Sequence, residues 1–190
     1  MQTTKPVVEP SITKLDREEI VAPPYVSFST FKKLLDWLRS EGVPLQFDRS
    51  FWQAKFSGST GAQLVAALRF FGLLHGDRPL PDLENLVQST PDDRRFIIRE
   101  LLKDSYDAVP FNELDRATPA MVKQWFKLYP IDGHTLRKAI SFFVSAVKDA
   151  ELPMSNAVSK MAKSRSAKPS TSSATRDKQT AQNLLTSMAA

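Results

Sequence analysis

The most regular pattern of apolar and polar positions lies in residues 57–74, SGSTGAQLVAALRFFGLL. Its apolar positions recur at the spacing of one helix face: Leu64, Ala67, Leu68, Phe70 and Phe71. Either Ser57 or Ser59 can cap this helix by accepting a hydrogen bond from a free amide of its first turn. The pattern predicts a helix that buries one face in the core.

A turn signal follows this helix directly. Gly72 predicts the end of the helix, and Gly76 followed by Asp77, Pro79 and Pro81 prevents its restart. We expect a tight hairpin at this point.

Two more helices are predicted before residue 57. Ser29 is expected to cap the first, which ends at Gly42, and its shared face holds Phe31, Leu34, Leu35 and Leu38. The second spans about residues 48–56 and buries Phe51, Trp52 and Phe56. Three helices followed by a hairpin is the order of a winged helix-turn-helix unit, a fold that binds DNA in most cases and only proteins in others.

The rest of the chain also has the periodicity of helices. They are expected over residues 82–88, from Pro91 to about Tyr106, from Pro119 to about Leu128, and over residues 134–150. Thr90 and Thr118 each precede a proline, and this pair is a strong helix start. The inward positions are expected to include Phe96 in one helix and Leu128 in another, and Ser155 is expected to cap a brief last helix.

These elements predict a mainly α protein with disordered termini. A winged helix-turn-helix-like half over residues 23–90 packs on a helical half over residues 91–158. Residues 1–22 are expected to be a flexible arm, and residues 159–190 a disordered basic tail of Ser, Thr, Ala and Lys.

Two of the predicted helices repeat the pattern L-x-x-A-[L/I]-x-F-F at an offset of 72 residues. The first copy consists of Leu64, Ala67, Leu68, Phe70 and Phe71, and the second of Leu136, Ala139, Ile140, Phe142 and Phe143. Internal duplication and chance likeness between amphipathic helices both remain open. If the helices are duplicated, the two halves pack through their phenylalanine faces.

Composition excludes several chemistries. The chain has no cysteine, which excludes disulfides, thiol catalysis and thiolate metal sites. Its two histidines, His75 and His134, leave little material for imidazole-based catalysis or metal binding. We therefore expect no enzyme, no cofactor and no metal. No apolar run approaches the ~20 residues of a membrane span, so we expect a cytoplasmic protein without a membrane partner.

The net charge of +5 has a particular location. The net excess of basic over acidic side chains lies from Lys160 onward, and residues 1–159 are neutral as a whole. The high isoelectric point of the chain therefore does not by itself predict a positively charged surface on the folded part. Arg94, Arg95 and Arg99 alternate with carboxylates and predict a solvated, salt-bridged surface.

Several phrases of the sequence together resemble a prokaryotic family that is catalogued as a domain of unknown function. They are PYVSFSTF at 24–31, FDRS at 47–50, SGSTGAQLVAALRFFGLL at 57–74 and DGHTLRKAISFFVSAVKDAEL at 132–152. The resemblance spans about residues 23–155. It implies no activity and no catalytic residues, because the family has none assigned.

One functional hypothesis is binding of double-stranded DNA by the first half. The exposed face of the residue 57–74 helix is expected to present Ser59, Thr60, Gln63 and Arg69, and the hairpin to present Arg78. Arg49 and Lys55 are candidates for phosphate contacts, which position a protein on DNA without reading its sequence. The neutral charge of residues 1–159 opposes this hypothesis, because DNA readers neutralise several phosphates.

The rival hypothesis is a regulatory or adaptor module that binds a protein partner or forms a homodimer. A neutral, helical domain rich in aromatic residues suits that use. We expect the second half to supply an apolar patch, formed by Trp125, Phe126, Tyr129 and Phe142.

Overall fold

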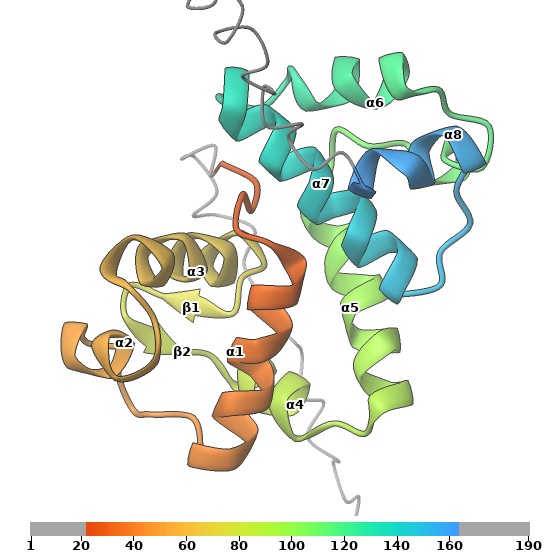
Figure 1. Ribbon diagram of the computed structural model, residues 1–190. Helices are drawn as coiled ribbons and strands as arrows, with labels where there is room; N and C mark the ends of the chain where they lie inside the picture. Colours follow the sequence, from red (N-terminus) through yellow and green to blue (C-terminus); the bar gives the residue numbers. More distant parts are fainter. Residues whose placement is uncertain (1–21, 164–190) are drawn as a thin grey trace, which may run out of the picture.

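The mainly α fold expected from the sequence is confirmed. A computed structural model describes residues 22–163, which form eight α-helices, short 3-10 turns and one two-stranded hairpin (Figure 1). Most of the expected arm and tail lies outside the described residues.

Side-chain caps begin the first three helices: α1 (Phe28–Glu41), α2 (Arg49–Lys55) and α3 (Gly58–Phe70). Ser27, Asp48 and Ser57 each accept a hydrogen bond from the backbone N–H three residues later. The prediction that Ser29 caps α1 was wrong. Ser27 has the extended backbone of a cap (φ −71°, ψ 140°), so the helix begins two residues earlier.

The expected hairpin is present. Strands β1 (Leu74–His75) and β2 (Arg78–Pro79) pair antiparallel, with His75 opposite Arg78. Gly76 in the turn has φ +59°, and Gly72 after α3 has φ +65°, both in the left-handed region that glycine adopts without strain. The order of three helices and a hairpin is therefore as the sequence predicts.

After the hairpin the chain contains four of the expected helices and the brief last one. They are α4 (Pro81–Gln88), α5 (Pro91–Ser105), α6 (Pro119–Phe126), α7 (Gly133–Asp149) and α8 (Asn156–Ser159), with the 3-10 turns η2 (Phe111–Glu113) and η3 (Lys160–Lys163). Thr90 and Thr118 cap α5 and α6 as expected. Two predicted core positions were wrong: Phe96 is 61% exposed because Ile98 and Leu102 supply the buried face of α5, and Leu128 is 69% exposed because α6 ends at Phe126.

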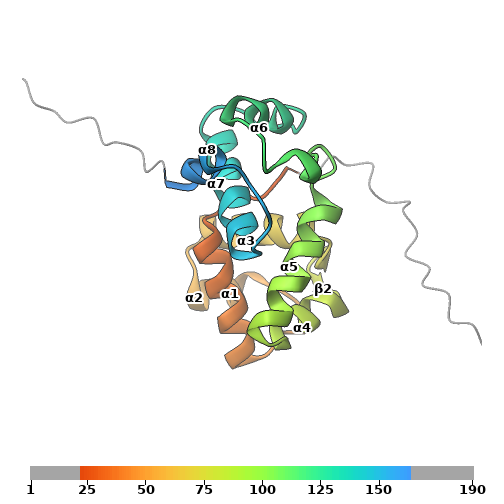
Figure 2. The same ribbon diagram turned by 90° about the vertical axis from the view of Figure 1, so that its right-hand side faces the viewer.

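One hydrophobic core joins the two halves around α7. This helix packs against α1, α5, α6 and η3 (Figure 2). The ring of Phe71, the last residue of the first copy of the repeated pattern, lies 6.0 Å from the ring of Phe142, the last but one of the second copy. The ring of Tyr106 stands 4.8 Å from the ring of Phe70 and 4.8 Å from that of Phe143. The two phenylalanine pairs therefore meet in the core, whatever their origin.

Two arginines of α5 tie helices together, in contrast to the solvated surface that the sequence predicts. Arg94 donates to the Asp36 carboxylate of α1 at 2.8 Å and to the Val87 carbonyl of α4 at 3.2 Å. Arg99 donates twice to the carbonyl of Ala150, which follows α7. Arg95 does lie on the surface, where it pairs with Asp92 and Glu151.

Candidate functional site

The hydroxyl groups at the start of α3 are engaged in its cap. The hydroxyls of Thr60 and Ser57 lie 2.9 Å apart, and the backbone N–H of Thr60 donates to the Ser57 hydroxyl at 3.4 Å. The exposed Ser59 hydroxyl lies 3.4 Å from that of Ser57. The geometry accounts for Ser59 and Thr60 as parts of a helix start.

Arg69, at the other end of α3, is directed toward the hairpin. Its guanidinium donates to the carbonyl of Gly76 from Nε at 3.1 Å and from Nη2 at 3.0 Å. The same Nη2 donates to the Asp77 carboxylate at 3.1 Å. Arg69 therefore fixes the hairpin turn to the helix, and a base edge would have to compete for these donors.

The remaining DNA-contact candidates lie on three different elements. Gln63 is half-buried in the middle of α3, whereas Lys55 and Arg78 are exposed on α2 and β2. Gln63 and Arg69 are six residues apart, which separates their directions by about 120° around the helix. Between them the outer face of α3 carries Ala62 and Ala66, side chains that cannot hydrogen-bond to bases.

A groove lies beside this face, between α2, α3, the loop before α2 and the hairpin turn. Its volume is ≈ 580 Å³. The apolar lining comes from Phe47, Trp52, Ala62 and Val65, and the polar lining from Gln46, Asp48, Arg49, Gln53 and Asp77, with Gly58 at the start of α3. We call it the α2–α3 groove.

Hydrogen bonds hold the walls of the α2–α3 groove in place. The backbone N–H of Phe47 donates to the Asp77 carbonyl at 2.8 Å, which joins the loop before α2 to the hairpin. Hydrogen bonds from the Ser50 hydroxyl and the Phe51 amide lower the pKa of the Asp48 carboxyl from its usual value. The carboxylates of Asp48 and Asp77 and the guanidinium of Arg49 thus give the groove mixed charge.

Leu45 is 95% exposed and lies one residue before the lining of the α2–α3 groove begins. It precedes Gln46, which lines the groove, and it follows Pro44 in the loop between α1 and α2. The sequence analysis did not single out this residue. The signal was an isolated leucine between a proline and a glutamine, outside any periodic segment.

The prediction of an apolar patch in the second half was wrong. Phe126 and Phe142 are buried, and Trp125 and Tyr129 are half-buried. These side chains pack against the core around α7, so they leave no continuous aromatic surface among the described residues.

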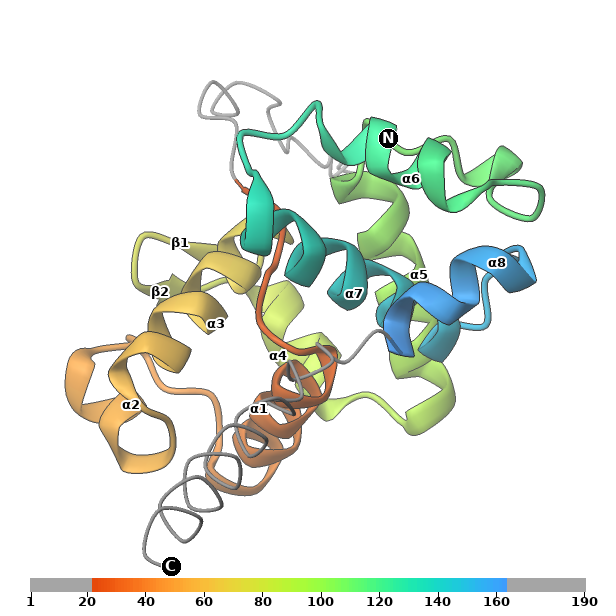
Figure 3. The ribbon, with the colours of Figure 1, turned by 45° about the horizontal axis from the view of Figure 1, so that its top comes forward.

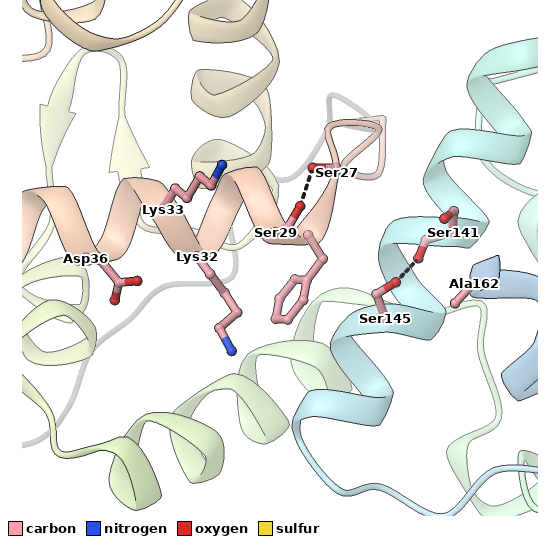
Figure 4. Close-up of a pocket in the computed structure, with 9 residues that line it drawn as sticks. Ser27, Ser29, Lys32, Lys33, Asp36, Ser141, Ser145 and Ala162 are labelled. Atoms are coloured by element: carbon pink, nitrogen blue, oxygen red, sulfur yellow. Dashed lines mark hydrogen bonds between the residues drawn. The ribbon is translucent and has the colours of Figure 1, made fainter. Parts of the chain in front are cut away.

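A second hollow, ≈ 670 Å³ in volume, lies between the start of α1 and the middle of α7 (Figure 4). Its polar groups are mostly engaged with one another. Lys32 pairs with Asp149 at 2.7 Å, the Ser145 hydroxyl donates to the Ser141 carbonyl, and the hydroxyls of Ser27 and Ser29 lie 2.9 Å apart. The Lys32–Asp149 pair joins α1 to α7, and the other two contacts lie within α7 and at the cap of α1, which indicates a structural role.

The part of the chain that the structure describes offers little for catalysis or metal binding. His75 and His134 are both exposed and lie on separate elements, β1 and α7. Within residues 22–163 no three His, Asp or Glu side chains are grouped so that they could hold a metal ion. In the same range no helix combines the length and the apolar character needed to cross a membrane.

Comparison with protein-family models gives no match, and comparison with curated proteins and with solved structures gives no significant match. The resemblance to a family of unknown function therefore stays a prediction. Function must be argued from the surfaces themselves.

Proposed function

We propose that this protein is a non-catalytic interaction module that binds a protein partner at the α2–α3 groove. The observation that carries this proposal is the placement of Leu45. An almost fully exposed leucine, one residue from the lining of an apolar-floored groove, provides a side chain that a partner can bury and a hollow that a partner can fill.

The composition of the groove favours a protein over a nucleic acid. Its lining carries the cation Arg49, the carboxylate of Asp48, and the carboxylate of Asp77, which pairs with Arg69. This near-balance of charge offers a polyanion no positive surface, whereas a mixed-charge rim around an apolar floor is the usual anatomy of a protein interface.

Photo-crosslinking in living cells tests this proposal. A photoreactive phenylalanine analogue at Leu45 is expected to give a discrete adduct, and a second substitution, Ala62→Arg, is expected to abolish it by filling the groove. The same analogue at Phe96, 61% exposed on α5, serves as the matched control. An adduct of twice the chain mass would identify the partner as a second copy. Absence of any adduct at Leu45, or an adduct that survives Ala62→Arg, would contradict the proposal.

Reading of DNA by α3 and the hairpin is the second candidate function. Lys55 and Arg78 favour it, because both are exposed and neither makes an ion pair within the described residues. The engagement of Arg69 with the hairpin makes this candidate the weaker of the two. Substitution of Lys55 and Arg78 is part of the experiment below and tests it directly.

A further inference from the structure

Positive charge is concentrated on α6, α7 and their connection. From Pro119 to the end of α7 at Asp149 there are two carboxylates, Asp132 and Asp149, against five basic side chains: Lys123, Lys127, Arg137, Lys138 and Lys148. Asp149 pairs with Lys32 of α1, so its charge is compensated from outside this segment. Over residues 22–118, in contrast, acidic and basic side chains nearly balance. The neutral total for residues 1–159 hides this local excess.

Four of these cations lie near the junction of the two helices. Lys123 and Lys127, one helical turn apart, are at the end of α6, and Arg137 and Lys138 are in the second turn of α7. All four are exposed, and none makes an ion pair with another described residue. We call these four residues the α6–α7 cations.

The arrangement of the two helices suits a long polyanion. α6 and α7 pack against each other and are joined by residues 127–132, so they follow one another as the two helices of a helix-turn-helix do. Figure 3 shows α6 and the connection to α7 along one edge of the molecule. Whereas residues 139–147 of α7 are largely buried, His134, Arg137 and Lys138 near its start are exposed. In helix-turn-helix proteins the start of the second helix is the part that enters the major groove.

We propose that the α6–α7 cations bind the phosphate backbone of duplex nucleic acid. The four side chains neutralise phosphates on either side of a groove, and the start of α7 faces the groove between them. The exposed Gln124 and His134 supply additional hydrogen-bonding groups on the same two helices. Duplex nucleic acid fits better than an acidic peptide because its charges continue along an axis longer than either helix.

The sequence after α7 has the same sign of charge. η3, which packs against α7, contains Lys160 and Lys163. The residues that follow add Arg165, Lys168, Arg176 and Lys178 against Asp177 alone. The positive regions of the chain therefore all belong to its second half. This site is separate from the α2–α3 groove, so its success or failure is independent of the proposed protein interaction.

The test is duplex binding by the full chain and by two variants of equal charge. In the first variant Lys123, Lys127, Arg137 and Lys138 are all changed to Gln. In the matched control four exposed cations of the first half, Lys33, Arg49, Lys55 and Arg78, are changed to Gln. Fluorescence anisotropy of a labelled duplex of about 30 base pairs is measured at salt concentrations from about 50 to 200 mM, the range over which phosphate contacts change affinity strongly.

We expect the full chain to bind the duplex and the α6–α7 variant to bind at least about tenfold more weakly. The plot of log K against log salt should become less steep by about 3.6, since each of the four phosphate contacts contributes about 0.9 to that slope. The control variant should keep its slope. Cations beyond residue 163 are present in all three proteins, so they do not contribute to the difference.

The inference is overturned if the unmodified chain does not bind, if the α6–α7 variant binds like the unmodified chain, or if both variants lose the same slope. It is also overturned if the α6–α7 variant loses binding to vesicles containing phosphatidylserine but keeps duplex binding. Thermal unfolding verifies that each variant folds. If the fourfold variant does not fold, two double variants replace it and its control: Arg137→Gln with Lys138→Gln, and Lys55→Gln with Arg78→Gln. The inference then requires that the salt slope change by about 2 in the first double variant and stay unchanged in the second.

Discussion

At the scale of single residues, the neighbours Arg94 and Arg95 show how burial decides what a charge contributes. The Arg94 side chain is 12% exposed and bonds to two other helices, whereas that of Arg95 is 46% exposed and bonds to carboxylates at the surface. We expect Arg94→Ala to lower the free energy of unfolding by about 2–3 kcal/mol, because it leaves a buried carbonyl without its charged donor. Arg95→Ala should cost at most about 1 kcal/mol. Urea denaturation of both variants measures the difference, and equal losses would contradict this account.

Tyr106 carries a buried hydroxyl in an aromatic environment. It is fully buried, and its hydroxyl has no hydrogen-bond partner among the described residues. Since an unpaired buried hydroxyl is unfavourable, we expect Tyr106→Phe to leave stability unchanged or to raise it by about 1 kcal/mol. Urea denaturation at neutral pH provides the measurement. A loss of more than about 1 kcal/mol would indicate that the hydroxyl has a partner after all, such as a buried water.

The same burial makes stability depend on pH in the alkaline range. Burial raises the pKa of Tyr129 to about 12 and raises that of Tyr106 well above its usual value. A tyrosine with a raised pKa in the folded state holds its proton more tightly there than in the unfolded chain. Its contribution is complete below about pH 10 and is lost as pH rises through the folded pKa.

We therefore expect the free energy of unfolding to fall between about pH 10 and pH 12, and to fall less in a variant carrying Tyr106→Phe and Tyr129→Phe. Urea denaturation at a series of alkaline pH values measures both curves. Parallel curves for the two proteins would show that other groups cause the decline.

At the scale of elements, the contact between α2 and α3 depends on a glycine. A Cβ at Gly61 would lie 3.0 Å from Cβ and 3.2 Å from Cγ of Trp52, whereas a Cβ at Gly58 would meet nothing within 4 Å. We expect Gly61→Ala to destabilise the protein by about 1–3 kcal/mol despite the better helix propensity of alanine. Gly58→Ala, in the same helix, should be neutral or stabilise by up to about 1 kcal/mol. Thermal unfolding of the pair decides this, and a stabilising Gly61→Ala would show that α2 moves away freely.

Helix positions could be predicted from the sequence where the signals are local. The caps at Ser57, Thr90 and Thr118 and the end of α3 at Gly72 depend on neighbours within a few residues, and all are confirmed. The prediction that Phe96 points inward was wrong. The buried face of a helix is decided by the elements that pack against it, and these lie far away in the sequence.

The candidate site was less predictable for the same reason. That Arg69 bonds to Gly76 and Asp77 depends on the hairpin folding back onto α3, which no helical pattern encodes. That Leu45 lies one residue before the lining of a groove depends on the loop before α2 meeting the hairpin turn. The charge excess on α6 and α7, in contrast, could have been found by counting over a shorter window of the sequence.

At the scale of the whole molecule, the two proposed surfaces lie far apart on one shared core. α2 and α6 stand at opposite ends of the molecule (Figures 1 and 3). A protein partner at the α2–α3 groove would therefore leave the α6–α7 cations free. This arrangement suits a module that brings a protein to a nucleic acid, with the shared core keeping the two surfaces at a constant separation.

A constant separation between the two surfaces requires that the two halves of the protein unfold together. Substitution of Phe142 tests this requirement. Its ring, on α7, lies 5.4 Å from that of Phe28, 5.8 Å from that of Phe31 and 6.0 Å from that of Phe71, all in the first half. We expect Phe142→Ala to lower the free energy of unfolding by about 3–5 kcal/mol, whereas Leu128→Ala, at an exposed position, should change it by less than about 0.5 kcal/mol.

Hydrogen exchange followed by mass spectrometry at increasing urea measures this loss separately in peptides from α3 and from α6. If the halves share one core, Phe142→Ala moves the loss of protection to lower urea by the same amount in both peptides. If α3 keeps its protection while α6 loses it, the halves are separate units. The core contacts would then be an interface between them, and binding at one surface could be relayed to the other by its opening.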